Sequence, residues 1–287
     1  MVFPAVKNKN VLVTGCSSGI GRAAAEMLRD RGWRVVPSAR KDEDMDALRC
    51  AGFEPVHIEL TDADSVATGF EKAQAVCGGD LGAVVNNAGY GQPGALEDIP
   101  RTTLAWQFEV NVIGMQHLTN LCIPVFRAQG YGRIVNVSSV LGRITMPFMG
   151  AYCASKYAME ALSDALRVEL HGSGIAVSII EPGPINTDFG KNSSEKLRAL
   201  DEVASIFGNH YETQARCLDD RKGRKDPYMR PPSAAAAKIV KALESRRPAS
   251  RYKVTLPAYA GAFIRRFAPD SFLDMMFVQL WKKRAGE

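Results

Sequence analysis

The chain has 287 residues, of which 46% are hydrophobic and 23% are charged, and its formal net charge is +5. This balance fits one large α/β domain, residues 1–287, with a well-buried core. The basic residues are scattered rather than gathered into a stripe. That pattern lacks the electrostatic footprint of a nucleic-acid groove, so no nucleic-acid partner is expected.

The cysteines and the N-terminus indicate the compartment. The six cysteines lack the close spacing of a metal site or of a disulfide framework, and the first residues lack the apolar core of a signal peptide. We therefore expect no bound metal ion and a reducing, cytoplasmic environment.

The first predicted strand, residues 10–14, leads through a glycine-rich turn, residues 15–21, into a helix. Glycines allow a tight turn and a close backbone approach, and the N-terminus of a helix offers unpaired N–H groups to a phosphate. The spacing Gly-x-x-x-Gly-x-Gly differs from the commonest dinucleotide fingerprint. Taken alone, the turn is equally consistent with an ordinary connection between a strand and a helix.

Strand-like runs continue along the chain and alternate with helical stretches. They cover residues 33–38, 54–58, 82–86, 132–138, 175–181 and 251–255, and a long helix is predicted over 102–129. Such alternation predicts a parallel sheet of about seven strands with helices on both faces. Its site should lie at the carboxyl ends of the strands, where Gly15, Asn87, Ser139 and Pro182 fall.

Tyr152 and Lys156 lie four residues apart in a predicted helix and therefore share one face. A phenol has a pKa of about 10, and a neighbouring ammonium group favours the phenolate and lowers that value. Tyr152 could then exchange a proton near neutral pH. In isolation, the pair also fits a chance contact on a helix surface.

Six motifs occur in a characteristic order between residues 8 and 190. They are Thr14-Gly15-x-x-x-Gly19-Ile20-Gly21, Asn86-Asn87-Ala88-Gly89, Asn111-Val112-x-Gly114, Ser139, Tyr152-x-x-x-Lys156 and Pro182-Gly183-x-x-x-Thr187. Together they resemble the short-chain dehydrogenase/reductase family, whose fold is a Rossmann-like doubly wound sheet. The segment around Tyr152, the turn after Glu181 and the long C-terminal tail are most similar to the hydroxysteroid and retinol dehydrogenase branch.

The resemblance implies a role for each motif. Tyr152 would be the general acid or base, Ser139 would hold the substrate oxygen, Lys156 would hydrogen-bond the nicotinamide ribose, and Asn111 would position a water molecule that relays protons. Ser138 is the alternative to Ser139, but the family's offset of thirteen residues before the tyrosine falls on Ser139. The implied cofactor-binding residues are Gly15, Ser17, Ser18, Gly19, Ile20, Gly21, Arg40, Asn87, Ala88, Gly89, Tyr152, Lys156, Pro182, Gly183, Ile185 and Thr187.

The end of the second strand decides between the two nicotinamide cofactors. An acidic residue there would accept hydrogen bonds from the ribose and repel a 2′-phosphate, but the chain has Ala39 followed by Arg40. The guanidinium group of Arg40 could clamp the phosphate, so we favour NADP(H) and keep NAD(H) as the alternative. Arg40 could instead be solvated, or neutralised by the acids at 42–44. Glu59 stands where relatives often carry an aspartate beside the adenine.

The substrate is expected to be small and apolar. The resemblance implies a mobile lid over about 188–230, and apolar residues recur in it at near-helical intervals: Phe189, Leu197, Leu200, Val203, Ile206, Phe207 and Tyr211. Phe148 and Met149 would form the opposite wall, beside Ser139 and Tyr152. Ordinary packing is an equally good explanation for each of these apolar residues.

The tail, about 256–284, predicts two apolar helices separated near Pro269. It is too short to span a bilayer, so it would pack on the body, cover the substrate site, join subunits of a homo-oligomer or lie on a membrane surface. Packing against protein is favoured over membrane contact, and we expect a homo-oligomer. The sequence thus predicts an oxidoreductase for ketones or secondary alcohols. The alternative is a nucleotide-sensing regulatory protein on the same fold.

Overall fold

The computed structural model describes residues 2–200, 205–219 and 226–285. Its core is a seven-stranded sheet with the order β3-β2-β1-β4-β5-β6-β7, in which every pair of neighbours is parallel. The strands are β1 (Asn10–Val13), β2 (Arg34–Ala39), β3 (Val56–His57), β4 (Ala83–Asn86), β5 (Gly132–Val137), β6 (Ile175–Glu181) and β7 (Arg251–Lys253). This confirms the predicted fold class. The edge strand β3 is shorter than predicted, since Pro55 has no N–H group for a sheet hydrogen bond.

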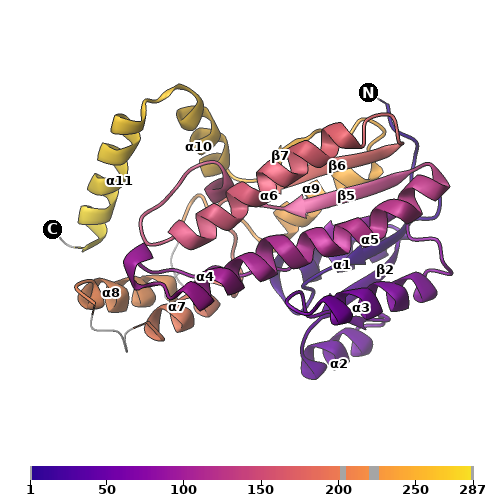
Figure 1. The fold of residues 1–287 in the computed structure, drawn as a ribbon, viewed down its shortest axis with the longest axis horizontal. Helices are drawn as coiled ribbons and strands as arrows, with labels where there is room; N and C mark the ends of the chain where they lie inside the picture. Colours follow the sequence, from indigo (N-terminus) through magenta and orange to yellow (C-terminus); the bar gives the residue numbers. More distant parts are fainter. Residues whose placement is uncertain (1, 201–204, 220–225, 286–287) are drawn as a thin grey trace.

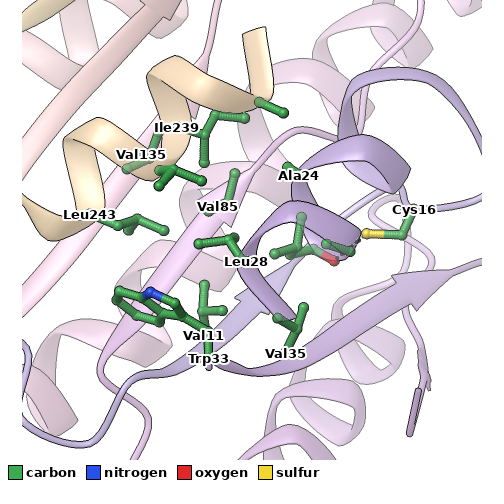
Figure 2. Close-up of a cluster of buried hydrophobic side chains, with 14 of the residues drawn as sticks. Val11, Cys16, Ala24, Leu28, Trp33, Val35, Val85, Val135, Ile239 and Leu243 are labelled. Atoms are coloured by element: carbon green, nitrogen blue, oxygen red, sulfur yellow. Dashed lines mark hydrogen bonds between the residues drawn. The ribbon is translucent and has the colours of Figure 1, made fainter. Parts of the chain in front are cut away.

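Helices cover both faces of the sheet, because successive strand residues point to opposite sides. Val11 and Val13 pack in a cluster with α1 (Gly19–Asp30), α2 (Asp42–Cys50) and α9 (Pro232–Glu244), part of which is shown in Figure 2. Leu12, between them, packs in a second cluster with α3 (Ala63–Val76), α5 (Gly114–Gln129) and α6 (Gly150–Glu169). Figure 1 shows the two helical layers with the sheet between them.

The strand order reverses between β1 and β4. From β1 the chain builds outward through β2 and β3, and it then returns to place β4 on the other side of β1. Loops diverge at such a point and leave a crevice at the carboxyl ends of the strands. The glycine turn after β1 and the loop that begins at Asn87 after β4 flank this crevice.

The predicted helix over 102–129 is present but is not uniform. The structure divides it into α4 (Arg101–Phe108), a π-helical turn (Glu109–Ile113) and α5. A π turn inserts one residue into the helical repeat, and such turns are frequent at functional sites. Asn111 lies in the middle of this turn and is fully buried. Hydrophobic periodicity did not reveal the insertion, because both flanking helices keep the ordinary repeat.

Two segments extend beyond the sheet and its layers. The chain from Ile185 to Arg230 leaves the body and returns at a β-bridge between those two residues, and it carries α7 (Phe189–Arg198) and α8 (Gly208–Asp219). The predicted lid residue Val203 lies outside the described residues. The tail forms α10 (Leu256–Phe267) and α11 (Asp270–Ala285), drawn in yellow in Figure 1. None of the helices in the described ranges has the length and hydrophobicity needed to cross a membrane.

Gly114, the first residue of α5, lets this helix approach the loop after β3. A Cβ atom there would lie 2.0 Å from the carbonyl oxygen of Leu60, which belongs to the backbone and cannot turn aside. Glycine at this position therefore allows the close approach of α5 to this loop.

We expect Gly114→Ala to lower the free energy of unfolding by about 2–3 kcal/mol, the cost of overpacking a rigid neighbour. Alanine normally stabilises a helix relative to glycine, so the sign is diagnostic. The matched control is Gly261→Ala in α10, where the new Cβ would first meet a side-chain methyl group of Val140, 3.0 Å away. This control should change stability by less than about 1 kcal/mol in urea denaturation. Equal effects of the two substitutions would contradict the close-approach argument.

Candidate active site

The turn after β1 is shaped to receive a phosphate. Gly15 has φ +70°, a backbone conformation that favours glycine, and a Cβ atom there would lie 2.7 Å from Cα of Ala88. Ser18 precedes α1 without making a side-chain capping bond, so the first N–H groups of α1 lack that partner, and Ser18, Gly19 and Ile20 line the crevice. These donors and the positive end of the helix dipole fit the diphosphate of a dinucleotide.

The loop after β4 holds the turn in place. The hydroxyl oxygen of Thr14 accepts hydrogen bonds from the N–H groups of Asn87 and Ala88, both at 3.0 Å. The side-chain amide of Asn87 donates to the carbonyl oxygens of Thr14 at 2.9 Å and Gly15 at 3.1 Å. The side chain of Asn87 therefore organises the cradle, which leaves its backbone to face a ligand.

The strand-end residues Ala39 and Arg40 lie at the same crevice. Arg40 makes an ion pair with Glu59, with 3.4 Å between Nη1 and Oε2, and its side chain is 57% exposed. Lys41 pairs with Glu43 at 3.2 Å. Among the described residues, Arg40 pairs with Glu59 and not with the acids at 42–44. Its guanidinium group therefore stays accessible to an anion.

Ser139, Tyr152 and Lys156 come together at the end of β5. Ser139 follows this strand and begins a short 3₁₀ turn (Val140–Gly142), while Tyr152 and Lys156 lie in the first two turns of α6. Nζ of Lys156 donates to the carbonyl oxygen of Val137 at 2.8 Å and lies 5.9 Å from the centroid of the Tyr152 ring. Tyr152 and Lys156 are 7% and 4% exposed. The structure thus brings the three predicted residues to one buried corner.

The expected lowering of the Tyr152 pKa does not occur in the free chain. Burial raises the pKa of Tyr152 above its ordinary value, and a hydrogen bond with Ser139 opposes that rise only in part. Burial also lowers the pKa of Lys156 to about 8, against the opposing effect of Glu160. Loss of hydration dominates both shifts, and the ammonium group of Lys156 donates to the carbonyl oxygen of Val137. Tyr152 is therefore protonated at neutral pH.

Asn111 supports this corner from behind. Its amide group donates to the carbonyl oxygen of Tyr90 at 2.9 Å and to the hydroxyl of Ser155 at 3.1 Å, while its oxygen accepts from the N–H of Tyr90 at 3.1 Å. A Cβ atom on Gly89 would lie 3.0 Å from that oxygen and 3.6 Å from Nζ of Lys156. Asn111 therefore joins the loop after β4 to α6, next to the lysine.

One cleft of about 1580 Å³ contains nearly all the predicted site residues. Gly21 and Asn111 are the two exceptions: Asn111 is buried behind the wall, and a Cβ on Gly21 would meet the carbonyl oxygen of Gly15 at 2.3 Å. The remaining predicted residues line the cleft: Gly15, Ser17, Ser18, Gly19, Ile20, Arg40, Asn87, Ala88, Gly89, Ser139, Phe148, Met149, Tyr152, Lys156, Pro182, Gly183, Ile185 and Thr187. The sequence interpretation missed Tyr90 and Lys196, which line it too but belong to no motif.

The apolar wall divides into two parts. Met149 packs beside Tyr152, and the ring of Phe189 on α7 lies 5.4 Å from the Tyr152 ring. Phe148, at φ +59°, turns toward the lid, where its ring meets Phe207 at 5.3 Å and Tyr211 at 6.2 Å. Met149 and Phe189 are therefore next to the reacting corner, whereas Phe148 mainly joins the wall to the lid.

Comparison with known protein families agrees with this geometry. A model of the short chain dehydrogenase family matches residues 9–198, which include the glycine turn, Ser139, Tyr152 and Lys156. The chain belongs to the short-chain dehydrogenase family. It is an oxidoreductase of that family, as the sequence predicted.

Named relatives match most of the chain. It is 39% identical over 269 residues to the uncharacterized oxidoreductase YbbO of Escherichia coli, covering 94% of each chain. It is 33% identical to the NADPH-dependent 3-dehydrocapnine reductase of Ornithobacterium rhinotracheale, covering 96% and 98%. Mouse retinol dehydrogenase 16 is 35% identical over 77% of this chain and 76% of its own, which supports the predicted branch.

A solved structure is similar throughout. A short-chain dehydrogenase/reductase from Burkholderia phymatum, in complex with NAD, has a TM-score of 0.77 at 26% identity and covers 93% of this chain and 94% of its own. Together with the NADPH-dependent relative, this supports a nicotinamide cofactor for the family member described here.

The buried lysine leads to a test of stability against pH. Because the pKa of Lys156 falls from 10.5 when unfolded to about 8 when folded, the unfolded chain holds one more proton between these values. Stability contributed by this group therefore rises with pH in that window. The unfolding free energy of the wild type should increase relative to Lys156→Met by up to about 3 kcal/mol between pH 8 and 10.5 in urea titrations.

Comparing the two proteins at each pH cancels the titrations that they share. If the difference in unfolding free energy between the wild type and Lys156→Met stays constant from pH 7 to 10.5, burial does not lower the pKa of Lys156.

Proposed function

We propose that the chain is an NADP(H)-dependent oxidoreductase that transfers hydride between nicotinamide and an apolar ketone or secondary alcohol. The observation that carries this proposal is the position of the Tyr152 phenol, beside Ser139 and Lys156, in the cleft that contains the phosphate cradle. Bound nicotinamide would supply or accept the hydride.

The chain's own residues would manage the proton. Tyr152 would donate its proton to the carbonyl oxygen of a ketone, and the hydroxyl of Ser139 would hydrogen-bond that oxygen as charge develops on it. Since burial keeps Tyr152 protonated, the free chain has the form needed for reduction. Lys156, with a pKa of about 8, would retain enough positive charge at neutral pH to stabilise the phenolate left after the transfer.

The preference for NADP(H) rests on the end of β2. Ala39 offers no acceptor to a ribose, and Arg40 lines the cleft with its side chain largely exposed. A guanidinium group binds phosphate with two parallel hydrogen bonds, so a 2′-phosphate would exchange the 3.4 Å contact with Glu59 for a stronger one. The NADPH-dependent relative favours the same choice, whereas the similar structure from B. phymatum contains NAD.

The proposed apolar substrate class rests on the side chains that line the cleft opposite the nucleotide cradle. Met149 and Phe189 lie next to Tyr152, and Leu141 and Met146 pack in the same cluster. From the tail, Pro257 of α10 and Phe277 and Leu280 of α11 also line the cleft. A steroid-like, retinoid-like or lipid-like substrate would bury its apolar part among these side chains and present its oxygen to Tyr152.

Tyr152→Phe removes the proton donor and little else. We expect the variant to melt like the wild type and to bind NADPH with unchanged affinity, while its kcat for ketone reduction falls by about 10² or more. NADPH absorbance with a panel of apolar ketones measures the rate, and isothermal titration measures the binding. Activity above about a hundredth of the wild-type value would rule out Tyr152 as the general acid.

Removing α11 tests the apolar wall. A chain that ends at Ala268 keeps α10, which packs on the 3₁₀ turn after Ser139, but loses Phe277 and Leu280. We expect KM for large apolar ketones to rise roughly fivefold or more, because lost apolar contact of this size costs about 1–2 kcal/mol. KM for a small ketone and the affinity for NADPH should change less than about twofold.

A cooperative thermal melt must first show that the shortened chain folds. Equal KM changes for large and small ketones would mean that α11 has no part in the substrate wall.

A further inference from the structure

The lid helix α7 carries three basic residues that line the cleft. Lys196 is partly buried there, whereas Lys191 and Arg198 are exposed. Nζ of Lys196 lies 4.5 Å from the centroid of the Tyr90 ring. Tyr90 directly follows the cradle residues Asn87–Gly89, and its backbone is fixed by Asn111. The ammonium group is therefore positioned over the nucleotide side of the cleft.

The surroundings of Lys196 leave its charge poorly balanced. Among the described residues it forms no ion pair with a carboxylate, and its aromatic partner is the face of the Tyr90 ring. Burial lowers the pKa of Lys196, the positive charge of Arg40 lowers it further, and the neighbouring Glu195 opposes this shift only in part. Arg40 and Lys196 line the same cleft, Arg40 from the end of β2 and Lys196 from the lid.

Two cations that face each other across a cleft are stabilised by an anion between them. A cation–π contact at a partly exposed site contributes only about 0.5–1 kcal/mol, less than a charge-assisted hydrogen bond to phosphate. An arriving phosphate would therefore displace Tyr90 as the partner of Lys196.

We propose that Lys196 is a phosphate ligand supplied by the lid, and that it closes on the bound dinucleotide from the side opposite Arg40. This inference rests on the proposed function, since it requires a nucleotide in the cleft. The proximity of Arg40 favours the 2′-phosphate of NADP(H) over the diphosphate that both cofactors share. Lys196 would then contribute to cofactor choice, and cofactor binding would be coupled to the position of α7.

Isothermal titration of the full-length chain with NADPH and with NADH tests the proposal without relying on activity. Lys196→Met keeps an unbranched apolar stem against Tyr90 but removes the charge, and Lys196→Arg keeps the charge. The control is Lys72→Met, which removes an exposed lysine of α3 that does not line the cleft. A thermal melt of each variant checks the fold.

We expect Lys196→Met to weaken NADPH binding about tenfold or more, the value of one charge-assisted hydrogen bond, while Lys196→Arg and Lys72→Met stay within about threefold of the wild type. A loss confined to NADPH assigns Lys196 to the 2′-phosphate, and an equal loss with NADH assigns it to the diphosphate. In the first case, the double variant Arg40→Gln/Lys196→Met should lose less binding free energy for NADPH than the two single variants lose together, because both residues would bind the same 2′-phosphate.

Unchanged affinity of Lys196→Met for both cofactors would overturn the inference and leave the proposed function intact, provided that the wild type binds NADPH. If Lys196→Arg loses as much NADPH affinity as Lys196→Met, the inference is overturned as well, because the lysine would then act through packing and not through its charge. If the wild type binds neither cofactor, the proposed function fails together with the inference.

Discussion

The hydrogen bonds between Thr14 and the loop after β4 are the contacts on which the site depends. Thr14 ends the first strand, and its hydroxyl oxygen accepts from two consecutive N–H groups, those of Asn87 and Ala88, at 3.0 Å each. The side chain of Asn87 returns two further bonds to the turn at Thr14 and Gly15. Loops that would otherwise diverge at the reversal of strand order are thereby joined, and both sides of the nucleotide cradle have a fixed spacing.

The reacting corner is connected to the same framework. Asn111 binds the backbone of Tyr90, three residues after Asn87, and also the hydroxyl of Ser155 in α6. Lys156 in turn donates to Val137 at the end of β5. The groups that face a substrate are thus placed by elements of rigid secondary structure, whereas the lid and the tail complete the apolar wall. Such an arrangement would allow substrate preference to vary while the proposed proton transfer stays the same.

The sequence predicted the fold, and most of the proposed site residues line one cleft as expected, because both outcomes depend on local rules. Alternating apolar runs and helices require a parallel sheet, and glycines at the turn after β1 mark where backbone must approach a ligand. Tyr152 and Lys156 share a helix face through their spacing alone. Five of the strands agree with their predicted ranges to within one residue at each end; β3 begins two residues late and ends one early, and β7 ends two residues early.

What the sequence missed depends on three-dimensional context. The π turn at Asn111 changes the helical repeat by a single residue, and no apolar pattern records it. The pKa of Tyr152 depends mainly on how deeply its side chain is buried, and the spacing of residues in the sequence does not give that depth. Lys196 reaches the cleft only because α7 folds back over Tyr90. The expectations of a cytoplasmic location and of a homo-oligomer stay predictions.

The central claim is that this cleft transfers hydride, and transfer can be followed atom by atom. NADPH carrying deuterium at C4 of its dihydropyridine ring would be incubated with the protein and with apolar ketones of increasing size. Mass spectrometry would then locate the label. The account predicts one deuterium on the carbinol carbon of the alcohol product. Binding of NADPH without label in any product alcohol would contradict it and favour a nucleotide-sensing protein on the same fold.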